Sequence, residues 1–320
     1  MTQLTALAAD VFAGGFSLGV QRYFRVLAHF EENSYGVATA RRNFPKMPIH
    51  VGFDKWPLDE YRGKVNFVFA NPPCAAWSVA GYTKTRGTDK WRTDPRVDCS
   101  RKCFSLLKEL HPEVYATESV TQAWTKGREF FEELMKEAAD DGYSCTVLLH
   151  DAQWLGLPQV RKRVFFVFHR VAFNPVAPNW QPTPTPLQAL EGVTPGEPRY
   201  EGNAKKWPAK LLRRVKPGER LAKFWEREIA GPEPWPRNAR GKIAGRPSFG
   251  HYRLPKDRPG GAIVGYSIIH PTEPRWISTE EMQALNGFPE SYHFIPNSPG
   301  ARASEIARGV CPPVAEWLAR

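Results

Sequence analysis

Short apolar segments alternate with amphipathic, helix-like segments along roughly the first half of the chain. The pattern predicts strands at residues 4–12, 25–31, 65–70, 114–118, 144–150 and 163–169, with helices after residue 14, up to residue 43 and over 126–141. This alternation indicates an α/β fold with a mostly parallel sheet and helices on both faces. Ligands of such sheets bind beyond the carboxyl ends of the strands, so the residues there are the first functional candidates.

A glycine-containing turn follows the first predicted strand and has the sequence Phe12, Ala13, Gly14, Gly15 and Phe16. Glycines let the backbone turn sharply and approach a ligand at a helix start, although a tight connection without a ligand explains the turn equally well. The second strand ends in Glu31 and Glu32. A carboxylate at this place can accept hydrogen bonds from both ribose hydroxyls of a nucleoside cofactor, and Glu31 is the better placed of the two. The alternative is a surface carboxylate near a helix N-terminus.

The candidate nucleophile is Cys74, which follows the strand at 65–70 in the sequence Asn71, Pro72, Pro73 and Cys74. Two prolines stiffen the loop and fix the direction of the thiol, which suits a nucleophile. The other cysteines considered, Cys99, Cys103 and Cys145, have no such setting, and we predict inert, buried thiols.

The five cysteines form an odd set, which fits reduced thiols better than a disulfide framework. The Cys99 to Cys103 spacing lacks a second ligand pair, so we expect no metal site.

Further polar residues lie near the ends of later strands. Glu118 ends one predicted strand, and Gln159, Arg161 and Arg163 lead into another. A thiol, a carboxyl group and guanidinium groups could therefore converge over one edge of the sheet. Taken separately, each residue is better explained as a surface charge or a satisfied polar group.

The chain is basic, and its charge is unevenly distributed. The net charge is +11, and residues 171–270 hold 17 Lys and Arg against 8 Asp and Glu, together with 15 of the 30 prolines. Basic charge suggests a polyanionic partner such as nucleic acid. The Pro-rich stretch predicts a separate, loop-rich module facing that anion, with a solvated basic linker as the alternative.

No apolar run approaches the roughly 20 residues that span a bilayer, and the start lacks the features of a signal peptide. We therefore expect a cytoplasmic protein with no membrane partner.

Seven segments, in this order, resemble the motifs of DNA cytosine-5 methyltransferases. They are DVFAGGFSLG, FEENSYGVATARRNFP, NPPCAAWS, TESV, QVRKR, PRWISTEEMQALNGFPESY and ARGVCPPVAEWLA. The resemblance implies a Rossmann-like, S-adenosylmethionine-dependent methyltransferase domain with a smaller, loop-rich target-recognition domain. It implies a catalytic and cofactor-binding domain over 1–171, a target-recognition region over 172–260 and a return segment over 261–320.

The family's motifs also imply roles for individual residues. Cys74 would attack C6 of the base, Glu118 would bind N3 and the exocyclic amine, Arg161 would contact O2, and Arg163 would orient Glu118 or a phosphate. The cofactor would lie against Phe12 to Phe16, Glu31, Glu32, Asn71 and Pro72. Double-stranded DNA, bound by a monomer, would contact Ser78 and Gln159. In the basic stretch, which matches none of the motifs, charge and residue type alone predict phosphate contacts for Lys205, Lys206, Arg213 and Arg214 and base contacts for Arg237, Asn238 and Arg240.

Three positions depart from the family pattern. The glycine loop is two residues shorter than usual, Ser119 replaces an Asn, and Arg308 with an inserted Cys311 alters the last motif. We expect an active enzyme from a divergent, bacteriophage-like branch. The alternatives are an RNA cytosine-5 methyltransferase and a DNA-binding pseudoenzyme with an impaired cofactor loop.

Overall fold

The computed structural model describes residues 3–78, 90–198, 209–229, 250–265 and 267–320. The chain divides into two compact units. The first comprises residues 1–152, 162–179 and 309–320, and the second comprises residues 153–161 and 180–308. The first unit thus combines most of the predicted catalytic region with the end of the predicted return segment, whereas residues 261–308 belong to the second unit.

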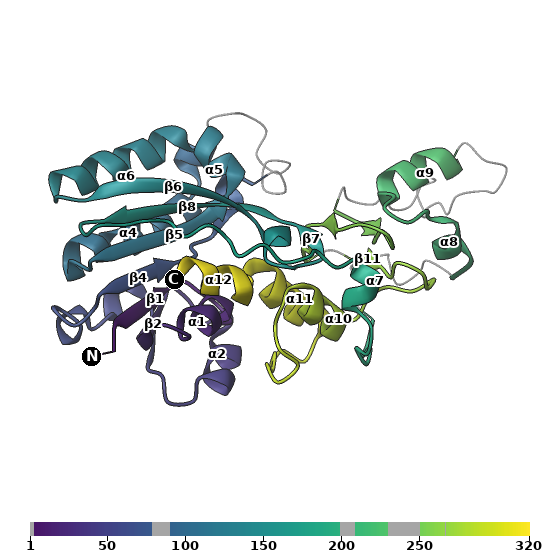
Figure 1. The fold of residues 1–320 in the computed structure, drawn as a ribbon, viewed down its shortest axis with the longest axis horizontal. Coiled ribbons are helices and arrows are strands. Elements are labelled where there is room, and N and C mark those ends of the chain that lie inside the picture. Colours follow the sequence, from purple (N-terminus) through teal and green to yellow (C-terminus); the bar gives the residue numbers. More distant parts are fainter. Residues whose placement is uncertain (1–2, 79–89, 199–208, 230–249, 266) are drawn as a thin grey trace. The chain divides into compact units, whose positions relative to one another are not determined.

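A seven-stranded sheet organises the described part of the first unit, in the order β3-β2-β1-β4-β5-β8-β6 (Figure 1). Its strands are β1 (Thr5–Ala9), β2 (Arg25–Glu31), β3 (Ile49–Val51), β4 (Phe67–Ala70), β5 (Val114–Val120), β6 (Ser144–Asp151) and β8 (Lys162–His169). The first five strands in this order, β3, β2, β1, β4 and β5, pair in parallel. Strand β8 lies between β5 and β6 and runs antiparallel to both. The predicted mostly parallel α/β sheet is therefore confirmed.

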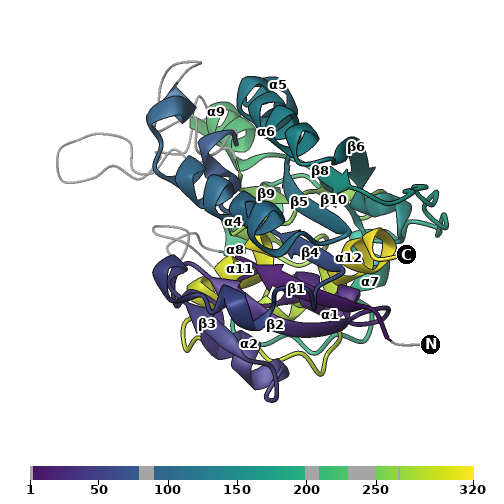
Figure 2. The ribbon, with the colours of Figure 1, turned by 90° about the vertical axis from the view of Figure 1, so that its left-hand side faces the viewer.

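Helices cover both faces of this sheet, with α4 and α6 on one side and α1 and α12 on the other (Figure 2). The helices are α1 (Gly15–Val20), α2 (Val37–Asn43), α4 (Arg96–Leu110), α5 (Thr121–Thr125), α6 (Arg128–Asp140) and α12 (Pro312–Leu318). Side chains of β4 alternate between the faces. Val68 and Ala70 join the core cluster beneath α4, whereas Phe69 contacts Phe16 of α1 with ring centroids 4.7 Å apart. Burial on both faces explains why this strand is apolar throughout.

The observed elements differ from the predicted ones in three places. The helix predicted over 126–141 is α6, and the short helix α5 that precedes it was not predicted. Strand β3, which has only three residues, was not predicted. Helix α4 was not predicted either, because charged residues of its exposed face interrupt the apolar residues of its buried face along the chain.

The C-terminal helix completes the first unit. Helix α12 packs against α1, so the two ends of the chain meet in one layer. Trp317 of α12 stacks on His150 with centroids 4.3 Å apart, and its Nε1 donates to the carbonyl of Val176 at 2.9 Å.

The second unit consists of short elements joined by loops. Its described elements are 3₁₀ turn η5 (Ala152–Trp154, whose first residue belongs to the first unit), β7 (Gln159–Val160), α7 (Pro186–Ala189), α8 (Ala209–Arg214), α9 (Leu221–Ile229), β9 (Tyr252–Arg253), β10 (Gly260–Gly261), β11 (Ile268–Ile269), α10 (Thr279–Leu285) and α11 (Pro299–Arg308). A small apolar cluster holds α8 and α9 to β11, and includes Leu212, Phe224 and Ile269. None of the helices in the described part of the chain has the length and apolar character needed to cross a bilayer.

Candidate active site

Cys74 lies in a short turn beyond the carboxyl end of β4. It begins the 3₁₀ turn η3 (Cys74–Ala76), and its side chain is half-buried. Trp77 anchors this turn, because its buried ring packs against Phe130 and Phe131 of α6 at centroid distances of 5.6 and 5.3 Å. Gly127 permits this approach, since a Cβ there would lie 2.5 Å from Nε1 of Trp77. The fold therefore holds the backbone of Cys74 firmly.

Glu118 lies on β5, next to β4 in the sheet, and both of its carboxylate oxygens are held. Nδ2 of Asn71 donates to Oε2 at 2.7 Å, and Nε of Arg163 lies 2.7 Å from Oε1. Asn71 and Glu118 are each 3% exposed. A buried carboxylate with a fixed orientation suits hydrogen bonding to one edge of a base. The Asn71 amide thus contacts Glu118, and its predicted contact with the cofactor stays a prediction.

Arg96 is a further charged residue close to Cys74. It begins α4, which packs against the η3 turn, and its Nε donates to Oδ1 of Asp94 at 2.8 Å. The hydrogen bonds that Arg96 donates to the Asp94 carboxylate raise the pKa of Arg96, and the charge of Cys74 adds a smaller contribution. A guanidinium near a cysteine favours its thiolate. Arg96 is not among the predicted site residues, because α4 was not predicted.

The carboxyl ends of β1 and β2 carry a group of acidic residues at the predicted cofactor site. Glu31 accepts hydrogen bonds from the backbone N–H groups of Val11 and Phe12, both at 3.2 Å, and Asp10 accepts one from the N–H of Glu32 at 2.7 Å. Burial raises the pKa of Asp10 to about 6. Burial and the adjacent Asp10 raise the pKa of Glu31 well above its usual value, although the two N–H groups oppose the rise.

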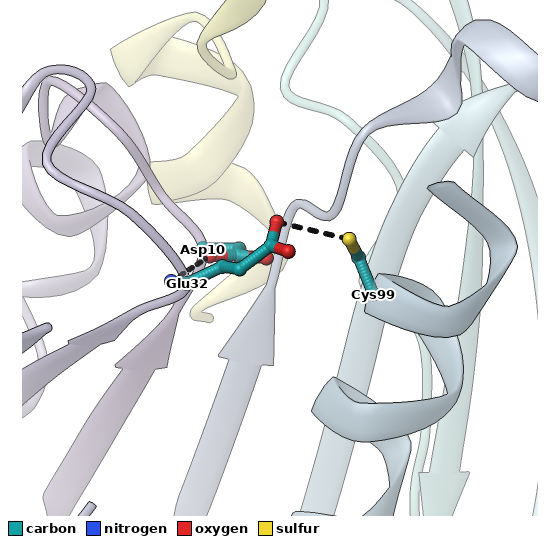
Figure 3. Close-up of side chains that lie close together, drawn as sticks. All are labelled: Asp10, Glu32 and Cys99. Carbon is teal, nitrogen blue, oxygen red and sulfur yellow. Dashed lines mark hydrogen bonds between the residues drawn. The ribbon is translucent and has the colours of Figure 1, made fainter. Parts of the chain in front are cut away.

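Glu32 extends from the end of β2 towards α4, where its Oε2 accepts a hydrogen bond from the Cys99 thiol at 3.0 Å (Figure 3). The ligand atoms of Asp10, Glu32 and Cys99 lie within 4.8 Å of one another, close enough to share a metal ion. Burial raises the pKa of Cys99 to about 12, so its thiol holds a proton at neutral pH. The hydrogen bond from the Cys99 thiol to Glu32 explains why these two side chains lie close together.

All five thiols are free, in line with the predicted reduced state. Cys99 and Cys103 are buried as predicted, and the thiol of Cys103 lies 3.7 Å from Oδ2 of Asp10. Cys145 is half-buried, not fully buried as predicted, although burial still raises its pKa to about 12.

The QVRKR segment is divided between the two units. Arg163 belongs to the first unit, whereas Gln159 and Arg161 belong to the second. Gln159 is fully buried and bonds Leu285 and Ile263 through its amide, with its Nε2 2.8 Å from the Leu285 carbonyl and its Oε1 2.9 Å from the Ile263 N–H. Arg161 donates to the carbonyls of Ile263 and Ala307 at 3.2 and 3.0 Å. Both side chains thus contribute to the packing of the second unit, and their predicted nucleic-acid contacts stay predictions.

The predicted phosphate-binding residues are only partly described. Arg213 and Arg214 are exposed at the end of α8, and Arg214 forms an ion pair with Glu228 of α9. Lys205, Lys206, Arg237, Asn238 and Arg240 lie outside the described residues. Ser78, which follows the η3 turn, has its backbone N–H bonded to the carbonyl of Cys74 at 3.2 Å.

The family model for C-5 cytosine-specific DNA methylases matches residues 8–320. The chain belongs to this family. Among the relatives of this methylase, the type II methyltransferase M1.HphI of Haemophilus parahaemolyticus is 23% identical over 97% of the chain and 84% of that protein. M.FnuDI of Fusobacterium nucleatum is 29% identical over 51% of the chain, and the match spans 46% of M.FnuDI, somewhat less than half of that relative.

Solved structures share the fold of this methylase. One is assigned as a DNA modification methyltransferase encoded within an E. coli prophage, with a TM-score of 0.65, 20% identity, and coverage of 99% of this chain and 97% of that one. Another is the methyltransferase EhMeth of Entamoeba histolytica, with a TM-score of 0.66, 13% identity and the same coverage.

Proposed function

We propose that this methylase transfers a methyl group from S-adenosylmethionine to C5 of cytosine in double-stranded DNA, with Cys74 as the covalent nucleophile. The observation that carries the proposal is the pairing of Asn71 and Arg163 with the two oxygens of Glu118, on the strand next to the Cys74 turn. This arrangement offers a thiol and an oriented carboxylate on adjacent strand ends. The proposed reaction needs both groups at the flipped base at the same time.

The residues at the ends of β1 and β2 fit the proposed cofactor. Glu31 and Glu32 place carboxylates where the hydroxyls of a nucleoside bind in a sheet of this type, and Gly14, with φ at +87°, lets the turn into α1 be tight. The cofactor supplies an electrophilic methyl group on a positively charged sulfur. The remaining chemistry falls to the side chains of this chain.

Cytosine C5 is a poor nucleophile, so the base must be activated. The Cys74 thiolate forms a bond to C6, which moves electron density onto the ring, and C5 then takes the methyl group, with S-adenosylhomocysteine as the leaving product. Glu118 stabilises the changed ring through N3 and the exocyclic amine. Loss of the C5 proton to solvent and cleavage of the C6–S bond release 5-methylcytosine and restore the thiolate. The contact of Arg161 with O2 is part of the same proposal.

The thiol must approach the face of the ring, which is covered in a stacked duplex. The target base therefore has to leave the helix, at a cost of roughly a few kcal/mol that protein contacts offset. We assign sequence choice to residues 172–260, because this basic, proline-rich stretch matches none of the catalytic motifs. Helix α8, which lies in this stretch, carries the exposed cations Arg213 and Arg214.

Conversion sequencing of DNA from cells that express the protein tests this proposal. We expect 5-methylcytosine at one sequence context in cells with the wild-type chain, and none in cells with Cys74→Ser. RNA from the same cells, converted and sequenced in the same way, shows whether the methylated substrate is DNA or RNA. Methylation confined to RNA, or equal methylation with both variants, would overturn the proposal.

A further inference from the structure

The two polar atoms of the Asn71 side chain have different surroundings. Nδ2 donates to Oε2 of Glu118 at 2.7 Å, whereas Oδ1 has no hydrogen-bond partner among the residues that the structure describes. Asn71 is only 3% exposed. Buried polar atoms in folded proteins nearly always have a partner. An unpaired buried acceptor beside the Glu118 carboxylate therefore indicates a place where a donor on a ligand binds.

The fold fixes the position of this amide. Strands β4 and β5 are neighbours in the sheet and pair in parallel, which brings Asn71 next to Glu118 (Figure 1). The backbone N–H of Asn71 donates to the carbonyl of Ala9 at 3.1 Å, which continues the pairing of β4 with β1. Pro72 comes next and restricts the backbone of Asn71 to extended conformations. The amide carbonyl is thus held beside the carboxylate of Glu118.

The two oxygens of Glu118 are flanked by groups of opposite hydrogen-bonding character. Nε of Arg163 lies 2.7 Å from Oε1, and a guanidinium has only donors. Asn71 lies on the side of Oε2. Its Nδ2 is bonded to the carboxylate, so the carbonyl oxygen is the group that it can offer to a ligand. The carboxylate therefore has a donor group on one side and an acceptor on the other.

The edge of a cytosine base has a matching asymmetry. Its exocyclic amine carries two N–H donors, and its O2 is an acceptor on the other side of N3. Glu118 can accept one of the two N–H groups, in line with the role proposed above. Oδ1 of Asn71 is available for the second, because the amide and the carboxylate are joined by a hydrogen bond and lie side by side. Uracil has a carbonyl oxygen in place of the amine, and two facing acceptors repel each other.

We propose that Oδ1 of Asn71 accepts a hydrogen bond from the exocyclic amine of the flipped cytosine, and that Asn71 thereby determines the preference for cytosine over uracil. This inference rests on the proposed function, because it assumes that the target base binds at Glu118. It gives the amide two roles. Nδ2 orients the carboxylate, and Oδ1 contacts the base.

Single-turnover methyl transfer to two duplexes tests the inference. The duplexes carry cytosine or uracil at the target position of the site that conversion sequencing identifies, with guanine opposite in both. In Asn71→Ala, we expect the ratio of the cytosine rate to the uracil rate to fall at least about tenfold, because the amine loses its acceptor and the uracil carbonyl loses a repulsive neighbour. The cost of base flipping differs between the duplexes but not between the proteins, so it does not affect this comparison.

Two further variants serve as controls. Asn71→Asp keeps an acceptor at the position of Oδ1, so its cytosine-to-uracil ratio should not fall by more than about threefold, although both rates fall. Arg163→Met frees Glu118 from its other partner without changing Asn71, so it should lower both rates and leave their ratio within about threefold. Where the uracil rate is too low to measure, the dissociation constants of the two duplexes in the presence of S-adenosylhomocysteine give the corresponding ratio.

The comparison between the variants decides the role of Asn71. The inference is overturned if Asn71→Ala lowers both rates by the same factor, because Asn71 then only orients Glu118. It is also overturned if Arg163→Met changes the ratio as much as Asn71→Ala does. Failure of the wild-type protein to methylate either duplex would instead contradict the proposed function, and the inference with it.

Discussion

Arg163 holds the carboxylate of Glu118 from the neighbouring antiparallel strand, with Nε 2.7 Å from Oε1. In the register of β5 and β8, Arg163 lies opposite Val120, so its side chain reaches diagonally to a residue two positions away. The pair is largely buried, with the two side chains 16% and 4% exposed. Salt therefore screens it less than a surface ion pair. Together with Asn71, this pair fixes the plane of the carboxylate that we assign to the target base.

The Arg163 contact predicts a defect in catalysis with little effect on cofactor binding. Arg163→Met should lower the single-turnover rate of methyl transfer by about 100-fold, because Glu118 loses its fixed orientation. Arg163→Lys should recover part of that loss, since it keeps the charge but not the planar donor group. Equal rates for Arg163→Met and the wild type, in a protein that unfolds normally, would contradict this role.

Asn71 offers a second test of how Glu118 is held. Asn71→Ala should slow methyl transfer but leave the affinity for S-adenosylhomocysteine within about twofold, because its amide bonds to Glu118. Asn71→Asp should be slower still, since it places a second carboxylate beside the first. Calorimetry and single-turnover kinetics measure the two effects separately. A large loss of cofactor affinity in Asn71→Ala would return this residue to its originally predicted role.

Asp10 predicts a pH dependence of stability. Its pKa is about 6 in the folded protein against an ordinary 3.8, so between these values the folded protein keeps a proton that the unfolded chain has lost. The free energy of unfolding should therefore fall as pH rises from about 4 to 6, by up to about 3 kcal/mol from this group.

The buried His29 has the opposite effect, because its pKa falls to about 3 and its contribution to stability grows as pH rises towards 6.5. The difference between wild type and Asp10→Asn removes the His29 contribution, which is common to both, and reports Asp10 together with its effect on the pKa of the adjacent Glu31. Urea unfolding at pH 4, 5, 6 and 7 measures this difference. Parallel stability curves for the two proteins would show that Asp10 is not perturbed.

The two arginines at the end of α8 predict different effects on DNA binding. Arg213→Gln should weaken binding to all sequences alike and reduce the slope of log affinity against log salt by roughly 0.9, as expected for one lost phosphate contact. Arg214→Gln should reduce the slope less, because Arg214 is already paired with Glu228. Fluorescence anisotropy over a salt series, with two unrelated duplexes, measures both. A change in sequence preference with Arg213→Gln would place this residue among the base contacts instead.

The sequence predicted the sheet well because buried parallel strands leave a strong local signal. The apolar run Phe67–Ala70 and its neighbours define strands with little ambiguity, and the polar residues that follow them mark the functional edge. The antiparallel insertion of β8 between β5 and β6 left no such local signal. Helix α4 was missed because its apolar positions are separated by charged residues that point to solvent.

Pairwise contacts within the site could not be read from the sequence. The motifs indicated that Asn71, Glu31 and Glu32 lie near strand ends, but the choice of partner depends on distances of a few ångströms. Asn71 contacts Glu118 because β4 and β5 are adjacent, and Glu31 contacts Val11 and Phe12 because the loop after β1 adopts positive φ values. Both facts arise from tertiary structure, which a single motif does not encode.

Covalent trapping tests the central claim, that Cys74 attacks the base, most directly. DNA carrying 5-fluorocytosine at the methylated site should form a detergent-resistant adduct in the presence of S-adenosylmethionine, because the fluorine at C5 cannot leave as a proton and the C6–S bond persists. Peptide mapping should locate the adduct on Cys74, and Cys74→Ala should form none. An adduct with Cys74→Ala, or one mapped to Cys99 or Cys145, would contradict the account.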